Sequence, residues 1–263
     1  MILLQWYNLY LQNFEGGMNI FSFDCFDLRV VLNPHNFYVG QAKSRLLSQF
    51  SDLSAECDLE EERYLERTAK YFDPERDDPA EACENATQIG IAHMHALMDM
   101  KNTVTLAMNA GMYHQFDKQL RDLILREFRH WNKLKAIKDI VWRTSFERII
   151  ELMEWIGFDV KNKPYFHLLD ACRLVVNVYK HGDGVGHETL LQRYPKYYQQ
   201  LFGEALTSHE NLQITESDFD EFSSAIVTFW QDLQQHCQSE LALGINPTWW
   251  PEKAINKDIR RNC

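Results

Sequence analysis

Several common signatures are missing from this chain. Its six cysteines are scattered and form no Cys-x-x-Cys pair, which argues against a zinc site and against a disulfide framework. No P-loop, Gly-x-Gly-x-x-Gly or Gly-x-Ser-x-Gly motif is present, so the usual nucleotide-binding and serine-hydrolase classes are not indicated. Long uncharged apolar runs are also lacking. The sequence therefore predicts a protein without membrane spans, in the cytoplasm, with reduced thiols.

Positive charge is scarce as well. The chain has 27 Lys and Arg against 38 Asp and Glu, a formal net charge of -11 and a pI near 5.4. Non-specific nucleic-acid binding needs a basic surface that displaces counterions, and this balance argues against it. A local basic patch on an acidic protein remains compatible with these numbers.

The length allows one large domain or two small ones. The 263 residues include 45% hydrophobic and 25% charged residues, as in an ordinary globular protein. We expect residues 1–17 to be a leader, because Met18 follows Gly16-Gly17 as an alternative start and the apolar beginning is a poor signal peptide. Three further segments are expected: an extended N-terminal segment over 18–50, a helical bundle over 51–240 and an irregular tail over 241–263.

Patterning along the chain predicts a mostly α protein. The stretch 21–38 is rich in aromatic and β-branched residues, and a turn at Asn33-Pro34 would make it a short strand or hairpin. The proline-free stretch 80–131 predicts one long helix, or two that break near Gly111. Further helices are expected over 139–158, from Pro164 to His181, and after a capping box formed by Ser217 and Asp220. The result is a bundle of long antiparallel helices with a small extended or β piece near the N-terminus.

One predicted helix carries an unusual polar stripe. In "YFHLLDACRLVVNVYKH" the residues at offsets of three and four are Asp170, Arg173, Asn177 and Lys180 with His181, which share one face. The other positions are almost all apolar, so this helix should be buried. Because buried polar groups without partners cost about 1–3 kcal/mol each, the stripe should face solvent, a groove or polar partners.

This stripe has a catalytic and a structural interpretation. Gly182 ends the helix, and the negative end of the helix dipole favours the imidazolium form of His181. His181 could then act as an acid/base in phosphodiester chemistry, with Arg173 or Lys180 on the phosphate and Asn177 orienting a hydroxyl; neither a metal nor another cofactor is needed. In the structural interpretation Asp170 and Arg173 form an ion pair, and His181 caps carbonyl groups at the helix end.

The segment "NVYKHGDG" resembles the signature of HEPN domains, which are α-helical bundles of prokaryotic toxins, antiviral defence proteins and RNA-processing enzymes. Catalytic members carry Arg-x4–6-His, often as Arg-Asn-x-x-Lys-His, at a helix end. Asn177, Lys180 and His181 match that pattern. The resemblance implies a metal-independent endoribonuclease that acts on RNA, usually as a homodimer with a shared cleft.

The match is incomplete at the arginine. Val176 stands where the family has arginine, and seven residues separate Arg173 from His181. A strict match, Arg29 to His35, spans the predicted turn and is interpreted as accidental. The resemblance therefore leaves two hypotheses: a live endoribonuclease, or a catalytically silent module that binds a partner protein of the same system.

A basic cluster is the expected substrate groove of the nuclease hypothesis. The stretch "REFRHWNKLKAIK", residues 126–138, interleaves basic residues with Trp131, which suits phosphate contacts and base stacking. Within it Arg126, Arg129 and Lys133 are the predicted RNA-binding residues. A solvated helix end explains the same cluster.

Overall fold

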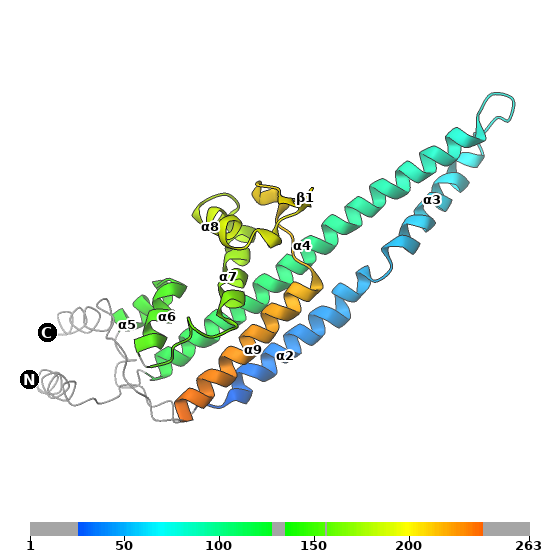
Figure 1. Ribbon diagram of the computed structural model, residues 1–263. Coiled ribbons are helices and arrows are strands. Elements are labelled where there is room, and N and C mark those ends of the chain that lie inside the picture. Colours follow the sequence, from blue (N-terminus) through cyan, green and yellow to red (C-terminus); the bar gives the residue numbers. More distant parts are fainter. Residues whose placement is uncertain (1–25, 128–134, 156, 239–263) are drawn as a thin grey trace, which may run out of the picture. The chain divides into compact units, whose positions relative to one another are not determined.

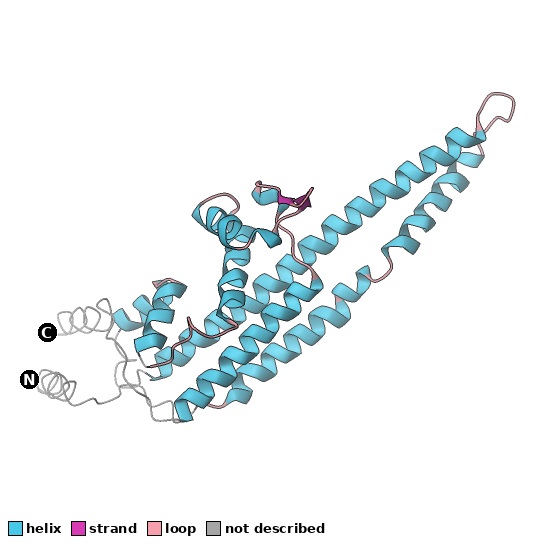
Figure 2. Ribbon diagram, in the orientation of Figure 1, coloured by secondary structure: helices cyan, strands magenta, loops and turns pink. Residues whose placement is uncertain are grey.

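The computed structural model describes residues 26–127, 135–155 and 157–238, and these are predominantly helical (Figure 2), as predicted. Figure 1 labels the main elements. The helices are α2 (Leu28–Arg45), α3 (Leu53–Ala69), α4 (Pro79–Glu127), α5 (Lys135–Arg143), α6 (Phe146–Trp155), α7 (Phe166–His181), α8 (Val185–Arg193) and α9 (Glu216–Gln238). Short 3-10 turns occur at η1 (Leu47–Phe50), η2 (Pro195–Tyr197) and η3 (His209–Asn211), and the strands are β1 (Gln200–Leu201) and β2 (Glu204–Ala205).

The expected strand or hairpin near the N-terminus is wrong. Of the stretch 21–38, residues 28–38 belong to helix α2, and Pro34 lies inside it; residues 21–25 lie outside the described residues. A proline in a helix removes one backbone hydrogen bond, yet Val31, His35 and Ala42 recur at intervals of four and seven and are all buried. Burial of this face therefore outweighs the strand preference of the β-branched residues.

The strands lie much later in the chain. In the described ranges the only sheet is the antiparallel pair β1–β2, joined by Phe202 and Gly203. Both turn residues have positive φ, 51° and 86°, which is the backbone form that two-residue hairpin loops require. Phe202 adopts it with a fully exposed side chain.

Helix α4 settles the choice left open near Gly111. It is a single helix of 49 residues that continues through this glycine. Tyr38 of α2 approaches so closely that a Cβ at position 111 would collide with its hydroxyl group. That hydroxyl donates a hydrogen bond to the carbonyl of Met108 at 2.9 Å. Gly111 thus serves close helix packing and does not break the helix.

The helix predicted over 139–158 is divided into α5 and α6. Arg121 of α4 is buried and forms an ion pair with Asp117 at 2.8 Å. Its guanidinium also donates to the carbonyl groups of Val141 and Thr144, at the end of α5. The arginine therefore satisfies carbonyls that a continuous helix would use itself, and the chain starts a new helix at α6.

Helix α9 begins slightly earlier than predicted. Thr215 and Asp218 form the capping box: the threonine hydroxyl accepts from the Asp218 N–H at 3.1 Å, and the Asp218 carboxylate accepts from the Thr215 N–H at 2.8 Å. The predicted pair Ser217 and Asp220 has no such role. Asp220 instead forms an ion pair with Lys43 at 2.7 Å.

The chain divides into two compact units, each built from separate segments. In the described residues the first unit comprises 26–35, 113–170 and 221–238, and the second comprises 36–112 and 171–220. The first unit has an aromatic core in which Phe116 contacts Phe229 and Trp230, with ring centroids 5.2 and 5.6 Å apart. Phe146 and Phe158 extend this core.

In the second unit, two asparagine side chains of α4 form hydrogen bonds to other segments. Asn102 donates to the carbonyl of Leu212 at 2.9 Å and accepts from the N–H of Ile214 at 3.3 Å. Asn109 is buried and accepts from the Cys172 thiol of α7 at 3.5 Å. These bonds attach both α7 and the segment before α9 to the same stretch of α4.

Candidate functional site

The predicted polar stripe lies on α7, which ends at His181 as expected. Exposure increases along the stripe toward its C-terminal end. Asp170 is buried, Arg173 and Asn177 are half-buried, and Lys180 and His181 are exposed. The structure thus places two of the predicted site residues in solvent and encloses the others to differing degrees.

The end of α7 has the predicted glycine conformation. Gly182 has φ of +68°, and its N–H still donates to the carbonyl of Val178 at 2.8 Å. A Cβ at this glycine would lie 3.3 Å from the ring of His209. The ring of His209 therefore lies close to the end of α7, where Lys180 and His181 are exposed.

Asn177 is a packing residue. A Cβ at Gly186, in the first turn of α8, would collide with the Asn177 amide nitrogen. Only a glycine allows α8 to approach α7 this closely. The amide that sequence reasoning assigned to substrate orientation therefore lies against the α8 backbone.

A buried histidine nearby was missed by sequence reasoning. His187 of α8 has its Nε2 3.0 Å from the carbonyl of Thr207 and its Nδ1 2.7 Å from the hydroxyl of Tyr198. Because a carbonyl only accepts, Nε2 donates to it and the Tyr198 hydroxyl donates to Nδ1. Burial raises the pKa of Tyr198 to about 12, so the phenol keeps this proton. No sequence motif marks the pair, because its members meet only through the fold.

The position of the missing arginine is closed to solvent. Val176 is 3% exposed and faces the core, so the family's arginine would be buried here.

Arg173 and His181 are eight positions apart, which is about 12 Å along a helix axis. Both side chains lean toward the N-terminus of the helix, so this lean leaves their separation along the axis unchanged. Arg173 is therefore poorly placed to act on the same phosphate as His181.

The strict match Arg29 to His35 lies in helix α2 and not in the predicted turn. Six positions on a helix turn through about 240°, so the two side chains diverge. Arg29 is exposed and pairs with Asp27 at 2.8 Å, whereas His35 is buried against the Ser223 hydroxyl at 2.9 Å. This arginine and histidine form no site together.

The predicted basic groove is described in part. Arg126 and Lys138 line an open hollow of about 980 Å³ in the first unit, together with Trp142 and the acidic Asp122. Trp142 is 41% exposed and provides the aromatic surface that sequence reasoning sought at Trp131. The other predicted groove residues, Arg129 and Lys133, lie outside the described residues, as do the expected leader 1–17 and the tail 241–263.

Metal-ligand clusters and membrane-crossing helices are both absent from the described residues. Among the described residues, no three His, Cys, Asp or Glu side chains come together as metal ligands would. In the same ranges no helix combines the length and the apolar character that a membrane crossing requires.

The described residues therefore form a mostly α protein with one long helix, a polar helix end and a small hairpin late in the chain. The chain was compared with protein-family models, curated proteins and solved structures, and it matches none of them. The HEPN resemblance therefore stays a prediction.

Proposed function

We propose that this chain is a catalytically silent, HEPN-like interaction module that works in the cytoplasm by binding a partner protein. The observation that carries the proposal lies in residues 53–100, which comprise α3, the following loop and the first part of α4. We call this segment the arm. Its two helices lie side by side (Figure 1), and Glu61 of α3 contacts Gly90 of α4.

The arm has almost no core. Of its residues only Cys57, Ala86 and Gly90 are buried. A helix pair in water is stabilised mainly by the apolar surface that it buries, and this pair buries little. Seven of its large apolar side chains are instead exposed: Leu59, Leu65, Tyr71, Ile89, Ile91, Met98 and Met100. Exposed apolar residues that share one helix face, as Ile89 and Met100 do, suit a surface that a partner covers.

The polar stripe supports the silent form of the family. Val176 is buried at the motif position, Asn177 packs against Gly186, and Arg173 lies about 12 Å from His181 along the helix axis. Val176 and Asn177 therefore have a structural explanation in the described fold. The stripe therefore gives no reason to prefer catalysis over binding.

Co-isolation from the native host tests this proposal. We would compare the wild type, an arm variant (Ile89→Ser with Met100→Ser) and His181→Ala. The expected result is a specific partner that co-isolates with the wild type and with His181→Ala, and is lost with the arm variant. A partner retained equally by all three, or purified protein that cuts RNA, would overturn the proposal.

A second candidate is the metal-independent endoribonuclease, acting as a toxin or defence effector. Lys180 and His181 favour it, because both are exposed at the end of one helix. In this case His181 is the acid/base, Arg173 and Lys180 bind phosphate, Asn177 orients a hydroxyl, and the RNA follows the Arg126 groove of a homodimer. Inducible expression should then stop bacterial growth and degrade RNA without added metal. A His181→Ala variant that remains equally toxic would exclude it.

A further inference from the structure

The net charge of the protein is concentrated on the arm. Residues 53–100 contain thirteen Asp and Glu against four Lys and Arg, so they carry a formal charge of -9 out of the chain's -11. The four basic residues are engaged locally: Arg63 pairs with Glu60 at 3.5 Å and Arg76 with Asp73 at 3.7 Å, while Arg67 and Lys70 lie over tyrosine rings. A surface of this sign repels nucleic acid and a second copy of itself, and attracts cations.

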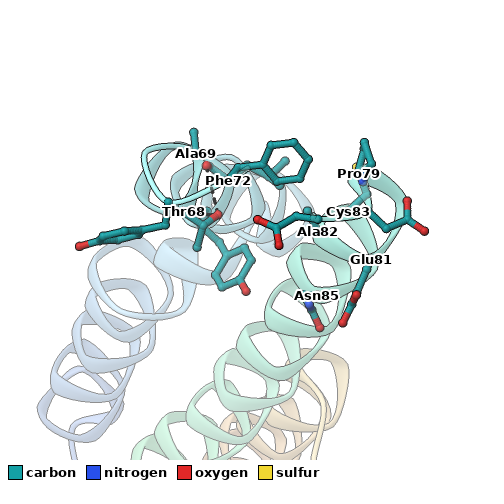
Figure 3. A pocket seen from close by; sticks show the side chains of 13 residues that line it. Thr68, Ala69, Phe72, Pro79, Glu81, Ala82, Cys83 and Asn85 are labelled. Carbon is teal, nitrogen blue, oxygen red and sulfur yellow. Dashed lines mark hydrogen bonds between the residues drawn. The ribbon is translucent and has the colours of Figure 1, made fainter. Parts of the chain in front are cut away.

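The tip of the arm is hollowed. A pocket of about 530 Å³ lies between the end of α3, the loop after it and the start of α4 (Figure 3). Its lining combines aromatic and acidic side chains: Tyr64, Tyr71, Phe72, Asp77, Asp78 and Glu81. Rings beside carboxylates are the surroundings in which a Lys or Arg side chain gains both cation–π and ionic attraction.

The tyrosines of this pocket already interact with cations of the chain itself. The Lys70 ammonium lies 4.9 Å from the Tyr71 ring centre, and the Arg67 guanidinium lies 5.7 Å from that of Tyr64. The carboxylates are held by the backbone. Asp78 accepts from the Ala80 N–H at 2.8 Å. Asp77 accepts from that of Asp73 at the same distance. Because cations of the chain already lie at the Tyr64 and Tyr71 rings, the fixed carboxylates of Asp77 and Asp78 and the ring of Phe72 are the groups that meet a partner's cationic side chain.

Apolar residues continue from the pocket along α4. Ile89 and Met100 lie seven and eighteen positions after Ala82 of the pocket and share its face of the helix, whereas Ile91 and Met98 lie on the opposite face. Met98 and Met100 are 56% and 57% exposed. Methionine suits a binding surface because its flexible side chain adapts to a partner.

We propose that the arm binds a basic, amphipathic helical segment of a partner protein, with one Lys or Arg side chain in the tip pocket and an apolar face against Ile89 and Met100. This inference rests on the proposed function and adds the chemistry of the partner. The distance from the pocket to Met100 corresponds to a helix of roughly 20 residues, at about 1.5 Å per residue.

Peptide binding to the full chain tests the proposal. The probes are three fluorescent helical peptides of roughly 20 residues, long enough to form helix. The first has lysines on one face and leucines on the other, the second has glutamates in place of the lysines, and the third keeps the lysines but has serines in place of the leucines. Fluorescence anisotropy gives the Kd of each. We expect the first to bind, the second not to bind, and the third to bind at least about tenfold more weakly than the first.

Matched variants separate the pocket from general attraction. Asp77→Asn with Glu81→Gln removes two charges from the pocket, and Glu62→Gln with Glu66→Gln removes two from exposed α3 positions outside it. The pocket pair should weaken binding of the lysine–leucine peptide about tenfold, and the control pair less than about twofold. Circular dichroism confirms that both variants remain helical.

The remaining outcomes overturn the inference in distinct ways. Equal weakening by both pairs would show attraction to net charge without a pocket. Equal binding of the serine peptide would show simple cation binding, without an apolar contact. Failure of the lysine–leucine peptide would remove the inferred partner chemistry, whereas the co-isolation experiment with the Ile89 and Met100 variant would still decide the proposed function.

Discussion

The arm and the aromatic core of the first unit are both built from long helices, yet they are stabilised differently. In the core, Trp230 contacts Phe26, Phe116 and Phe229 with ring centroids 5.4–5.7 Å apart, and it is fully buried. In the arm, residues of comparable size such as Tyr71 face solvent. The comparison shows that helical structure alone does not distinguish a segment that supports the fold from one that serves binding. The buried apolar surface distinguishes them.

The largest expected effect is in the core. Trp230→Ala should lower the free energy of unfolding by about 3–5 kcal/mol, because it removes a buried ring and leaves a cavity. Urea denaturation followed by circular dichroism measures this. Trp142→Ala is the matched control: its ring is largely exposed, and the change should cost below about 1 kcal/mol. Similar losses for both would contradict the assigned core.

A smaller effect is expected where α8 meets α7. Gly186→Ala should destabilise the protein by about 1–3 kcal/mol, because the new Cβ collides with Asn177. Asn177→Ala should relieve part of that loss in the double variant, measured as a double-mutant cycle in urea. Gly40→Ala provides the contrast, since nothing lies near its Cβ and alanine is the better helix former. Additive effects at 186 and 177 would show that the two residues are not in contact.

The buried histidine of α2 predicts a pH dependence. Burial lowers the pKa of His35, which the Ser223 contact offsets only partly. In the unfolded chain the residue takes up a proton near its ordinary pKa of about 6.5. The unfolded state therefore binds more protons than the folded state in this range, and stability falls as the pH drops below that value.

His35→Gln is the variant that isolates this effect, because glutamine can still bond to Ser223 but does not titrate. Its unfolding free energy should fall less steeply than that of the wild type between about pH 7 and pH 5.5, a range that spans the ordinary histidine pKa. Identical slopes would remove His35 as the cause.

The smallest stability effect is expected on the arm. Replacing Ile89 and Met100 with serine should change the free energy of unfolding by no more than about 0.5 kcal/mol each, because these side chains contribute little to the core. Thermal or urea unfolding of the isolated chain measures this. Losses as large as that of Trp230→Ala would show that the arm surface is structural, and would weaken the case for a docking function.

Parts of the candidate site were predictable and parts were not. The extent of α7, its polar stripe and the left-handed Gly182 follow from local periodicity and from the conformational freedom of glycine. The enclosure of Asn177 by Gly186 was not predictable, because it depends on how closely two helices approach. The same holds for the His187–Tyr198 pair, whose partners no sequence spacing connects.

The sequence by itself determined that this protein is mostly helical, where α7 and its polar stripe lie, and that its charge is acidic, because these depend on local patterning and on composition. Only the tertiary structure decided that 28–45 is a helix around Pro34, that Arg121 divides α5 from α6, and that the arm leaves its apolar residues exposed. The physical reason is that burial and long-range hydrogen bonds outweigh local preferences of a few tenths of a kcal/mol per residue.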